Sequence, residues 1–309
     1  MSMLMSKENE NNSNKHQKIE LRTHITSLSV HTEVVFCLTL LYDGRLVSGS
    51  YDCSIIIYNK ETYQTNIIIK EHKDAVRNLI QLKNKILASC SLDKTIKLFN
   101  IKETQYEIIQ TIDLHSDWVM KILELSNNYF VSGSKDKKII FYINEGKKYK
   151  KDYSISTSEG VRNIIETKQN EIVYSTWDDK INFFDLNERK NKSVIENISS
   201  SIYSFYMISK DLLLIIGEKI NIININEYKK IRQIDIPNAN WINGVCRLNN
   251  NEIITGDNSN TLREWKIEKD NLILISKKEN AHNGFINVIL NLGNEHFATG
   301  SDDNTIKIW

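Results

Sequence analysis

The sequence predicts an all-β protein, a β-propeller of seven four-stranded antiparallel blades. One pattern recurs along the chain: a short apolar strand, a Ser-rich turn with an acidic residue, and an alternating strand that ends in an aromatic residue. Successive turns are about 41 to 44 residues apart, except around a shortened fifth copy. The segments alternate with period two and are rich in Ile, Val, Tyr and Phe, which is typical of strands and excludes helical repeats.

Seven segments carry the pattern. In chain order they are Leu46–Tyr58, Leu87–Phe99, Phe130–Tyr142, Val173–Phe184, Leu213–Ile225, Thr255–Trp265 and Phe297–Trp309. The fifth is degraded and runs through Leu213–Glu218 and Ile220–Ile225 without the acidic turn. Each repeat has room for four strands, and a four-stranded sheet cannot bury both of its faces alone. We therefore expect seven sheets stacked radially in a ring.

The first strand of the chain is expected to close this ring. The seventh copy reaches only the end of its third strand at Trp309, so its fourth strand must come from elsewhere. The segment Lys18–Thr26 supplies a spare strand with apolar residues at Ile19, Leu21 and Ile25. We expect it to pair with Ile306–Trp309. Residues 18–309 would then form the propeller, and residues 1–17 a disordered polar tail.

Composition limits the class of protein and its location. The net charge is +1, which gives no global argument for nucleic acid, and no apolar run approaches the roughly 18 residues of a membrane span. The polar, Asn-rich start has no apolar block of signal-peptide length, so we expect an intracellular, cytoplasmic protein and leave a nuclear location open. The four cysteines are compatible with two disulfides or a zinc site. Because they are scattered, we expect reduced core residues and no metal.

Four blades share His, Ser or Thr, Asp and an aromatic residue in one register, with the His 21 positions and the Ser or Thr 4 positions before the Asp, and the aromatic residue 6 positions after it. The sets are His31, Ser48, Asp52 and Tyr58; His72, Ser89, Asp93 and Phe99; His115, Ser132, Asp136 and Tyr142; and His282, Thr299, Asp303 and Trp309. Over about 290 residues the chain resembles the WD-repeat (G-protein beta-subunit-like) family. The resemblance implies that each set is a structural hydrogen-bond network within its blade.

The chain also departs from the family pattern. The aromatic position holds Trp only at Trp265 and Trp309, and Tyr or Phe elsewhere leaves the Ser to a hydroxyl or to water. The fourth blade keeps Asp178 but has no His, and the sixth has Ser259 in the Asp position. The fifth blade lacks the network entirely, so we expect it to be the least stable part of the ring.

His, Ser and Asp in register also suggest a hydrolase, but catalysis is not the expected role. A nucleophile must be exposed beside an oxyanion hole, whereas these hydroxyls lie inside strands, and the set occurs four times. No phosphate-binding glycine motif leads from a strand into a helix. We therefore expect no catalytic residues, no cofactor and no small-molecule substrate.

The resemblance implies a partner-binding face, the one that carries the connections between blades and the Asp turns. Its rim positions lie three and five residues after the His and one before the Asp. The candidates, which we call the aromatic rim, are Tyr51, Arg77, Trp118, Met120, Lys135, Arg162, Trp177, Tyr203, Trp241, Phe285 and Asp302. Three of the five Trp fall in this set, and Trp, Tyr and Arg dominate interface hot spots. The alternative is that these side chains only pack around the channel.

The opposite face carries basic segments in three adjacent blades, in the loops between third and fourth strands. They are residues 147–151, Arg189–Lys192 and Lys229–Arg232. Together they are compatible with a patch for nucleic acid or anionic lipid. The main hypothesis is a non-catalytic scaffold that binds protein or peptide partners in a larger complex through the aromatic rim. The alternative is a nucleic-acid or anionic-membrane module that uses these basic segments. The sequence does not identify the partner.

Overall fold

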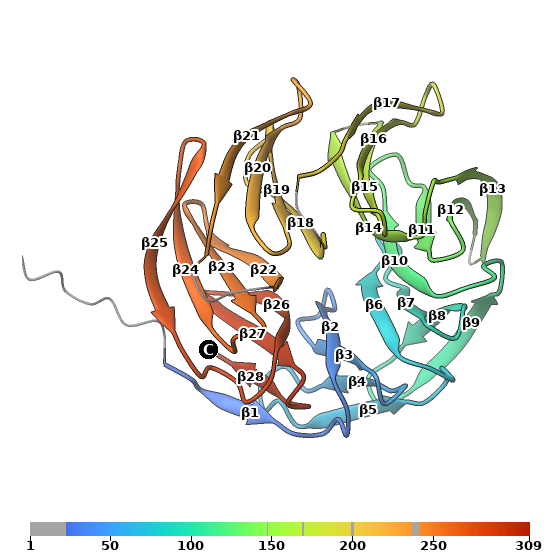
Figure 1. Cartoon of the computed structure of the whole chain (residues 1–309). Coiled ribbons are helices and arrows are strands. Elements are labelled where there is room, and N and C mark those ends of the chain that lie inside the picture. The colour runs from blue at the N-terminus through green and yellow to red at the C-terminus, as the bar shows by residue number, and fades with distance from the viewer. Residues whose placement is uncertain (1–22, 147, 169, 199–200, 237–240) are drawn as a thin grey trace, which may run out of the picture.

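A ring of seven antiparallel sheets, each with four strands, forms the computed structural model, which describes residues 23–146, 148–168, 170–198, 201–236 and 241–309. The seven-bladed propeller predicted from the repeat is therefore confirmed. In blades one to six the chain runs from a strand beside the central axis to one on the perimeter, and in blade seven the first strand of the chain takes the outermost position (Figure 1). The described residues form no helix, so none of their segments is a helix able to cross a membrane.

The strands of each blade follow one another from the axis outwards. Blade one consists of β2 (Val35–Leu40), β3 (Leu46–Ser50), β4 (Ile55–Tyr58) and β5 (Thr65–Ile69). Blade two consists of β6 (Val76–Gln81), β7 (Leu87–Ser91), β8 (Ile96–Ile101) and β9 (Tyr106–Ile112). Blade three consists of β10 (Val119–Glu124), β11 (Phe130–Ser134), β12 (Lys138–Glu145) and β13 (Lys148–Ser156). Blade four consists of β14 (Val161–Lys168), β15 (Glu171–Thr176), β16 (Ile181–Asp185) and β17 (Lys190–Ile195). Blade five consists of β18 (Ser204–Met207), β19 (Leu212–Ile216), β20 (Ile220–Asn224) and β21 (Lys229–Ile234). Blade six consists of β22 (Ile242–Asn249), β23 (Glu252–Asp257), β24 (Leu262–Glu268) and β25 (Asn271–Lys278). Blade seven consists of β26 (Ile286–Gly293), β27 (His296–Ser301), β28 (Ile306–Ile308) and β1 (Thr26–Leu28).

The first strand of the chain completes the last blade, as predicted. In the antiparallel β1–β28 pair, Thr26 lies opposite Ile308 and Leu28 opposite Ile306. The predicted bounds were wrong, because the strand covers Thr26–Leu28 instead of ending at Thr26. Ile25 precedes it and donates a backbone hydrogen bond to Ile308, but its side chain is 55% exposed. Most of the segment proposed for this strand, and the whole of the proposed tail, lie outside the described residues.

The hydrophobic core is divided among the blade interfaces. Seven clusters of buried side chains occur, and each combines residues of two neighbouring blades. The cluster between blades seven and one, for example, joins Leu28, Ile306 and Ile308 to Val35 and Leu46. Every residue of β3, β7 and β11 is buried, because neighbouring blades cover both faces of these strands. Each blade therefore depends on its neighbours for burial.

Small residues in the second strand allow this close stacking. A Cβ atom added at Gly49 would lie 2.7 Å from Val76 in the next blade, and one at Gly133 would lie 2.6 Å from Val161. Gly300 has the same relation to Val35 across the closing interface. The Gly within the recurring Ser-rich segment is thus required by space: a larger side chain would push neighbouring blades apart.

The cysteines follow the prediction with one exception. All four are unpaired, and Cys37, Cys90 and Cys246 are buried. The prediction of a core position was wrong for Cys53, which is half-buried in the Asp turn of blade one. It has a positive φ of 67°, a turn conformation that places its side chain at the surface.

Removing the closing strand is expected to destabilise the whole ring. A protein lacking residues 1–28 loses the pairing of β1 with β28, exposes the edge of β28 and uncovers the cluster that contains Ile306 and Ile308. Its melting temperature should fall by about 5 °C or more, or the protein should aggregate. Thermal melting with size-exclusion chromatography measures both effects. A protein lacking only residues 1–15 is the control and should melt like the full chain; equal melting of both truncations would show that β1 does not stabilise the ring.

Candidate functional site

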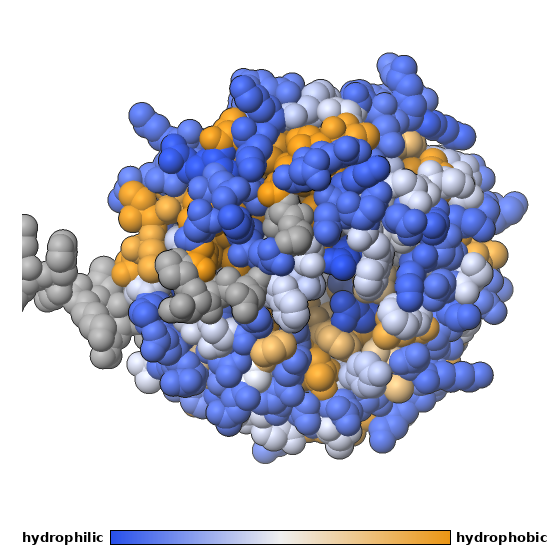
Figure 2. All heavy atoms as spheres, in the orientation of Figure 1, coloured by the Kyte–Doolittle hydropathy of each residue, from blue (hydrophilic) through white to orange (hydrophobic). Residues whose placement is uncertain are grey.

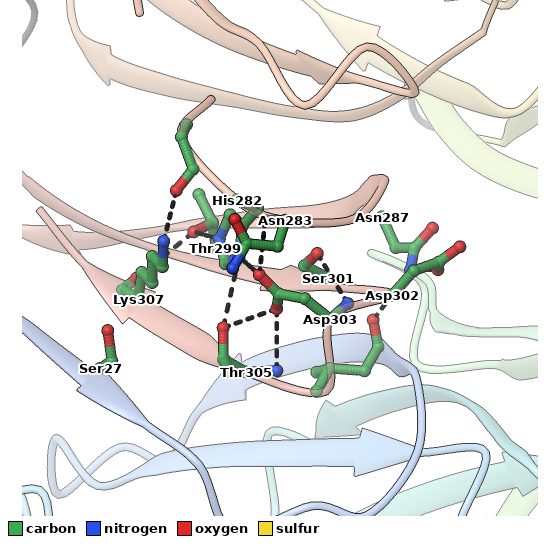
Figure 3. Close-up of polar contacts among 12 residues, drawn as sticks. Ser27, His282, Asn283, Asn287, Thr299, Ser301, Asp302, Asp303, Thr305 and Lys307 are labelled. Carbon is green, nitrogen blue, oxygen red and sulfur yellow. Dashed lines mark hydrogen bonds and ion pairs between the residues drawn. The ribbon is translucent and has the colours of Figure 1, made fainter. Parts of the chain in front are cut away.

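Buried histidines hold the Asp turns of blades one, two, three and seven. In all four sets the His Nδ1 lies 2.8–2.9 Å from the Asp carboxylate. The His Nε2 lies 2.6–2.7 Å from the Ser or Thr hydroxyl. In blade seven, His282 lies between Thr299 and Asp303, and Thr305 donates to the same carboxylate (Figure 3). The four predicted sets are therefore hydrogen-bonded as the register implied.

The aromatic position completes the network in three of these blades. The Trp309 indole N–H donates to Thr299 over 2.9 Å. The hydroxyls of Tyr58 and Tyr142 lie 3.2 Å and 3.0 Å from those of Ser48 and Ser132. A Tyr hydroxyl thus replaces the indole N–H in blades one and three, whereas Phe99 in blade two has no polar group to offer.

A second Ser, not singled out from the sequence, ties the turns of blades one, two and three to the preceding loop. Ser50 donates to the carbonyl of Glu33 and accepts a hydrogen bond from the amide of Asp52. Ser91 and Ser134 make the same pair of contacts in blades two and three. The signal was present in the sequence as the second Ser of the repeated Ser-x-Ser segment.

Blades four and six hold their turns differently. Asp178 accepts hydrogen bonds from Thr176 and Ser158 and pairs with Lys180, without a His. In blade six the acid is Asp257, two positions before the expected one, and it forms a buried ion pair with Arg263. Sequence reasoning missed this pair because neither residue is in the register. The hydrogen bond of Trp265 to Thr255 follows the family pattern at 2.9 Å.

Blade five shows no such network among the described residues, and buried side chains, most of them apolar, pack its strands together. All of Leu213–Ile216 and of Ile220–Ile223 is buried, including Asn221, whose amide has no hydrogen-bond partner among the described residues. An unpaired buried amide destabilises a fold. The expectation that blade five is the least stable remains a prediction.

The serine hydroxyls of the four sets have no access to solvent. Ser48, Ser89 and Ser132 are fully buried and engaged by histidine. A substrate cannot reach an oxygen in that position without unfolding the blade. The geometry therefore gives these sets a structural role.

The rim residues are brought together by one repeated backbone contact. In six blades a backbone hydrogen bond joins two rim positions. The amide of the residue just before the Asp position donates to the carbonyl of the residue three positions after the His position, and blades without the Asp or the His use the equivalent residues. The pairs are Tyr51 to Val34, Leu92 to Ala75, Lys135 to Trp118, Trp177 to Gly160, Asn258 to Trp241 and Asp302 to Phe285. These bonds are 2.8–3.0 Å long. The two rim positions of each of these blades are thus adjacent.

Cations and aromatic rings alternate across blades three to six. The Lys135 ammonium lies 3.8 Å from the Trp118 ring centre and 5.8 Å from that of Trp177. The Arg162 guanidinium lies 4.4 Å from Trp177 and 5.5 Å from Tyr203. The rings of Tyr203 and Trp241 are 6.3 Å apart. We call these six residues the stacked row. It joins residues separated by more than a hundred positions in the sequence.

A shorter group lies on blades one and two. Arg77 lies 4.2 Å above the ring of Phe36, which meets Tyr51 edge-on at 6.0 Å. Met120 lines the central channel beside Arg77 and Arg162. Asp302 accepts a hydrogen bond from Asn287 (Figure 3). Phe285 is 38% exposed. Phe285 and Asp302 therefore stand apart from the stacked row.

Five described basic side chains in the segments of the opposite face lie within ion-pair distance of acids. Residues 148–151, Lys190–Lys192 and Lys229–Arg232 belong to the starts of β13, β17 and β21, so their assignment to loops was wrong, whereas Arg189 lies in the turn before β17. Lys190 pairs with Glu188 at 2.9 Å, Lys192 with Asp185 at 2.6 Å, and Lys150 with Glu145 at 3.7 Å. Arg189 and Arg232 lie 3.9 Å and 3.7 Å from Asp152 and Asp270. These carboxylates reduce the positive field that an anionic surface would require.

Neutralising one Asp of the network should cost stability in a pH-dependent way. Burial alone would raise the pKa of Asp93, but hydrogen bonds from His72, the Lys73 amide and Thr95 lower it below its ordinary value. Its stabilisation is therefore complete above the unfolded pKa of about 3.9 and is lost as pH falls through the folded value. Asp93→Asn should lower the free energy of unfolding by about 1–3 kcal/mol at pH 7.

The difference between Asp93→Asn and the wild type should shrink as pH falls below about 4. Urea unfolding at pH 7 and pH 3 measures it. Glu268→Gln, which removes an exposed partner of Lys266, is the control and should change stability by at most about 1 kcal/mol. A pH-independent loss in Asp93→Asn would show that the carboxylate charge is not what the network uses.

Comparison with known families agrees with this geometry. The family model described as WD domain, G-beta repeat, matches residues 22–59, 63–100 and 276–309. The matched segments contain three of the four complete His–Asp sets, those of blades one, two and seven. A search of curated proteins finds no match to the chain. The matched repeats and the seven-bladed ring are together consistent with a WD-repeat family.

Proposed function

We propose that this chain is a non-catalytic scaffold that binds a protein or peptide partner, within a larger complex, through the aromatic rim. WD-repeat propellers generally act as protein-interaction scaffolds. The observation that supports the rim as the binding surface is its exposed aromatic area. Trp177, Trp241 and Tyr51 are 37%, 40% and 50% exposed, and the Arg162 guanidinium lies over the Trp177 ring. Large aromatic residues with Arg are the usual centres of interface energy.

The stacked row is also suited to binding because its side chains are already ordered. The Arg162 guanidinium is held over Trp177, and Lys135 is held over Trp118. Gly160 lies directly beneath Trp177, where an added Cβ would come within 2.9 Å of the indole. Side chains fixed in this way lose little conformational entropy when a partner arrives, which leaves more of the contact energy as affinity.

The exposed rings define what the partner must present. A Trp side chain buries a large apolar area and keeps its indole N–H available to a polar group at the edge. A partner segment with apolar side chains for Trp177 and Trp241, and an acidic group for Arg162, fits this surface. The ion pairs within the basic segments weigh against a nucleic-acid or membrane role for the opposite face.

Substituting the exposed tryptophans should remove the partner and leave the fold intact. In Trp177→Ala and Trp241→Ala the affinity should fall by about 2 kcal/mol, which is roughly thirtyfold. Recovery of bound proteins from a lysate of the cells that produce the protein, with tagged wild type and variants at equal amount, measures the loss. The melting temperature should change much less, because both rings lie at the surface.

Tyr42→Ala is the matched control for these variants. Tyr42 is 64% exposed and lies in the turn between β2 and β3, away from the rim positions. It should recover the same proteins as the wild type. Undiminished recovery by both Trp variants, or unfolding in place of lost binding, would assign the rim aromatics to packing.

A further inference from the structure

The centre of the ring holds a cavity of about 380 Å³ lined by residues of all seven innermost strands or the positions just before them. Its lining includes Arg77 from blade two, Lys121 from blade three and Arg162 from blade four. None of the described residues that line it is Asp or Glu. Figure 2 shows strongly hydrophilic residues within the hollow at the centre of the ring. Three adjacent blades thus contribute basic residues to one central cavity.

These three cations lack a countercharge. Among the described residues, no carboxylate lies within ion-pair distance of Arg77, Lys121 or Arg162, whereas the buried Arg263 of blade six is paired with Asp257. The ionisable groups that interact with Arg77 and Lys121 are the thiols of Cys37 and Cys90. Burial raises the pKa of Cys37 to about 12 and also raises the pKa of Cys90, so both thiols are neutral at pH 7.

The guanidinium groups also have free donors. Their flat faces stack on aromatic rings, Arg77 on Phe36 and Arg162 on Trp177. Their edges remain unsatisfied: Nε of Arg77, and Nε and Nη1 of Arg162, are buried without a hydrogen-bond partner in the described structure. Buried donors without acceptors are unfavourable, so an acceptor that reaches these groups would be bound favourably.

We propose that the central channel binds an oxyanion of the phosphate class between Arg77, Lys121 and Arg162. The guanidinium edge presents two parallel N–H donors, which match two oxygens of a phosphate, and Lys121 supplies a mobile point charge. Three uncompensated cations suit a group of two or more negative charges better than one carboxylate. The attraction between such charges is stronger inside the ring than in bulk water.

Two sources supply this chemistry. One is a phosphorylated side chain of the partner held on the aromatic rim, an assignment that rests on the proposed function. The other is a free polyphosphate that enters the channel without a partner. The rim and the channel meet at Arg162, which stacks on Trp177 and lines the cavity, so either ligand contacts the same three cations.

Titration with inorganic pyrophosphate tests the site directly. In calorimetry the wild type should bind it, and its melting temperature should rise above that in sodium chloride of equal ionic strength. The variant Arg77→Gln/Lys121→Gln/Arg162→Gln should bind at least about tenfold more weakly. The matched control Lys148→Gln/Lys151→Gln/Lys230→Gln removes the same charge from exposed positions in β13 and β21 and should bind like the wild type. Lys121→Met, a milder change, gives the same test if the triple variant does not fold.

A second arm identifies the source. A degenerate peptide library with one fixed phosphoserine, compared with the same library carrying serine, should be enriched on the wild type if the phosphate belongs to a partner. Binding of pyrophosphate without peptide enrichment assigns the site to a free polyphosphate. Trp241→Ala should retain pyrophosphate binding, which separates failure of the rim from failure of the channel. The proposal is overturned if the wild type binds neither probe, or if both channel variants bind them undiminished.

Discussion

Burial between neighbouring blades is the constraint on which this structure depends. A four-stranded sheet has two apolar faces, and each face is covered only by the next blade in the ring. The second strand of a blade, such as β3 or β11, is therefore buried on both sides and requires small residues where the next blade approaches. The ring must also close, since an open end would leave one cluster half-covered. That is the physical reason why a three-residue strand at Thr26–Leu28 matters to a chain of 309 residues.

The polar networks also stabilise the ring, at the surface where the turns between strands lie. A sharp turn between the second and third strands leaves backbone groups unpaired, and the Asp carboxylate with its two neighbouring hydroxyls satisfies them. The buried His anchors that carboxylate to the strand beneath it. Because the turn is rigid, the residue immediately before the Asp is held against the loop from the previous blade. Where a blade has this network, the network thus positions residues of the aromatic rim.

The basic side chains have different surroundings on the two faces of the ring. On the far side, Lys190, Lys192 and Arg232 lie beside Glu188, Asp185 and Asp270, which offset their charges. Basic side chains on the rim lie on aromatic rings, which stabilise a cation without neutralising it. Positive charge therefore remains available where the rim meets the channel, although the whole chain carries a net charge of only +1.

The sequence alone determined the number of blades, their antiparallel strands and four complete hydrogen-bond networks. These features were predictable because each network is confined to one blade, and its residues recur at a constant spacing set by the strand lengths. The closing strand was predicted in kind but misplaced, since a short strand with one buried residue, Leu28, carries little pattern. The Asp257–Arg263 pair was missed because it has the same role in a different register. The candidate rim was named from equivalent positions, but contacts such as that of Tyr203 with Trp241 join different blades. The meeting of Arg77, Lys121 and Arg162 in one channel was decided only by the closed ring. No local pattern contains it, because residues about forty positions apart become neighbours only when the blades stack around a common axis.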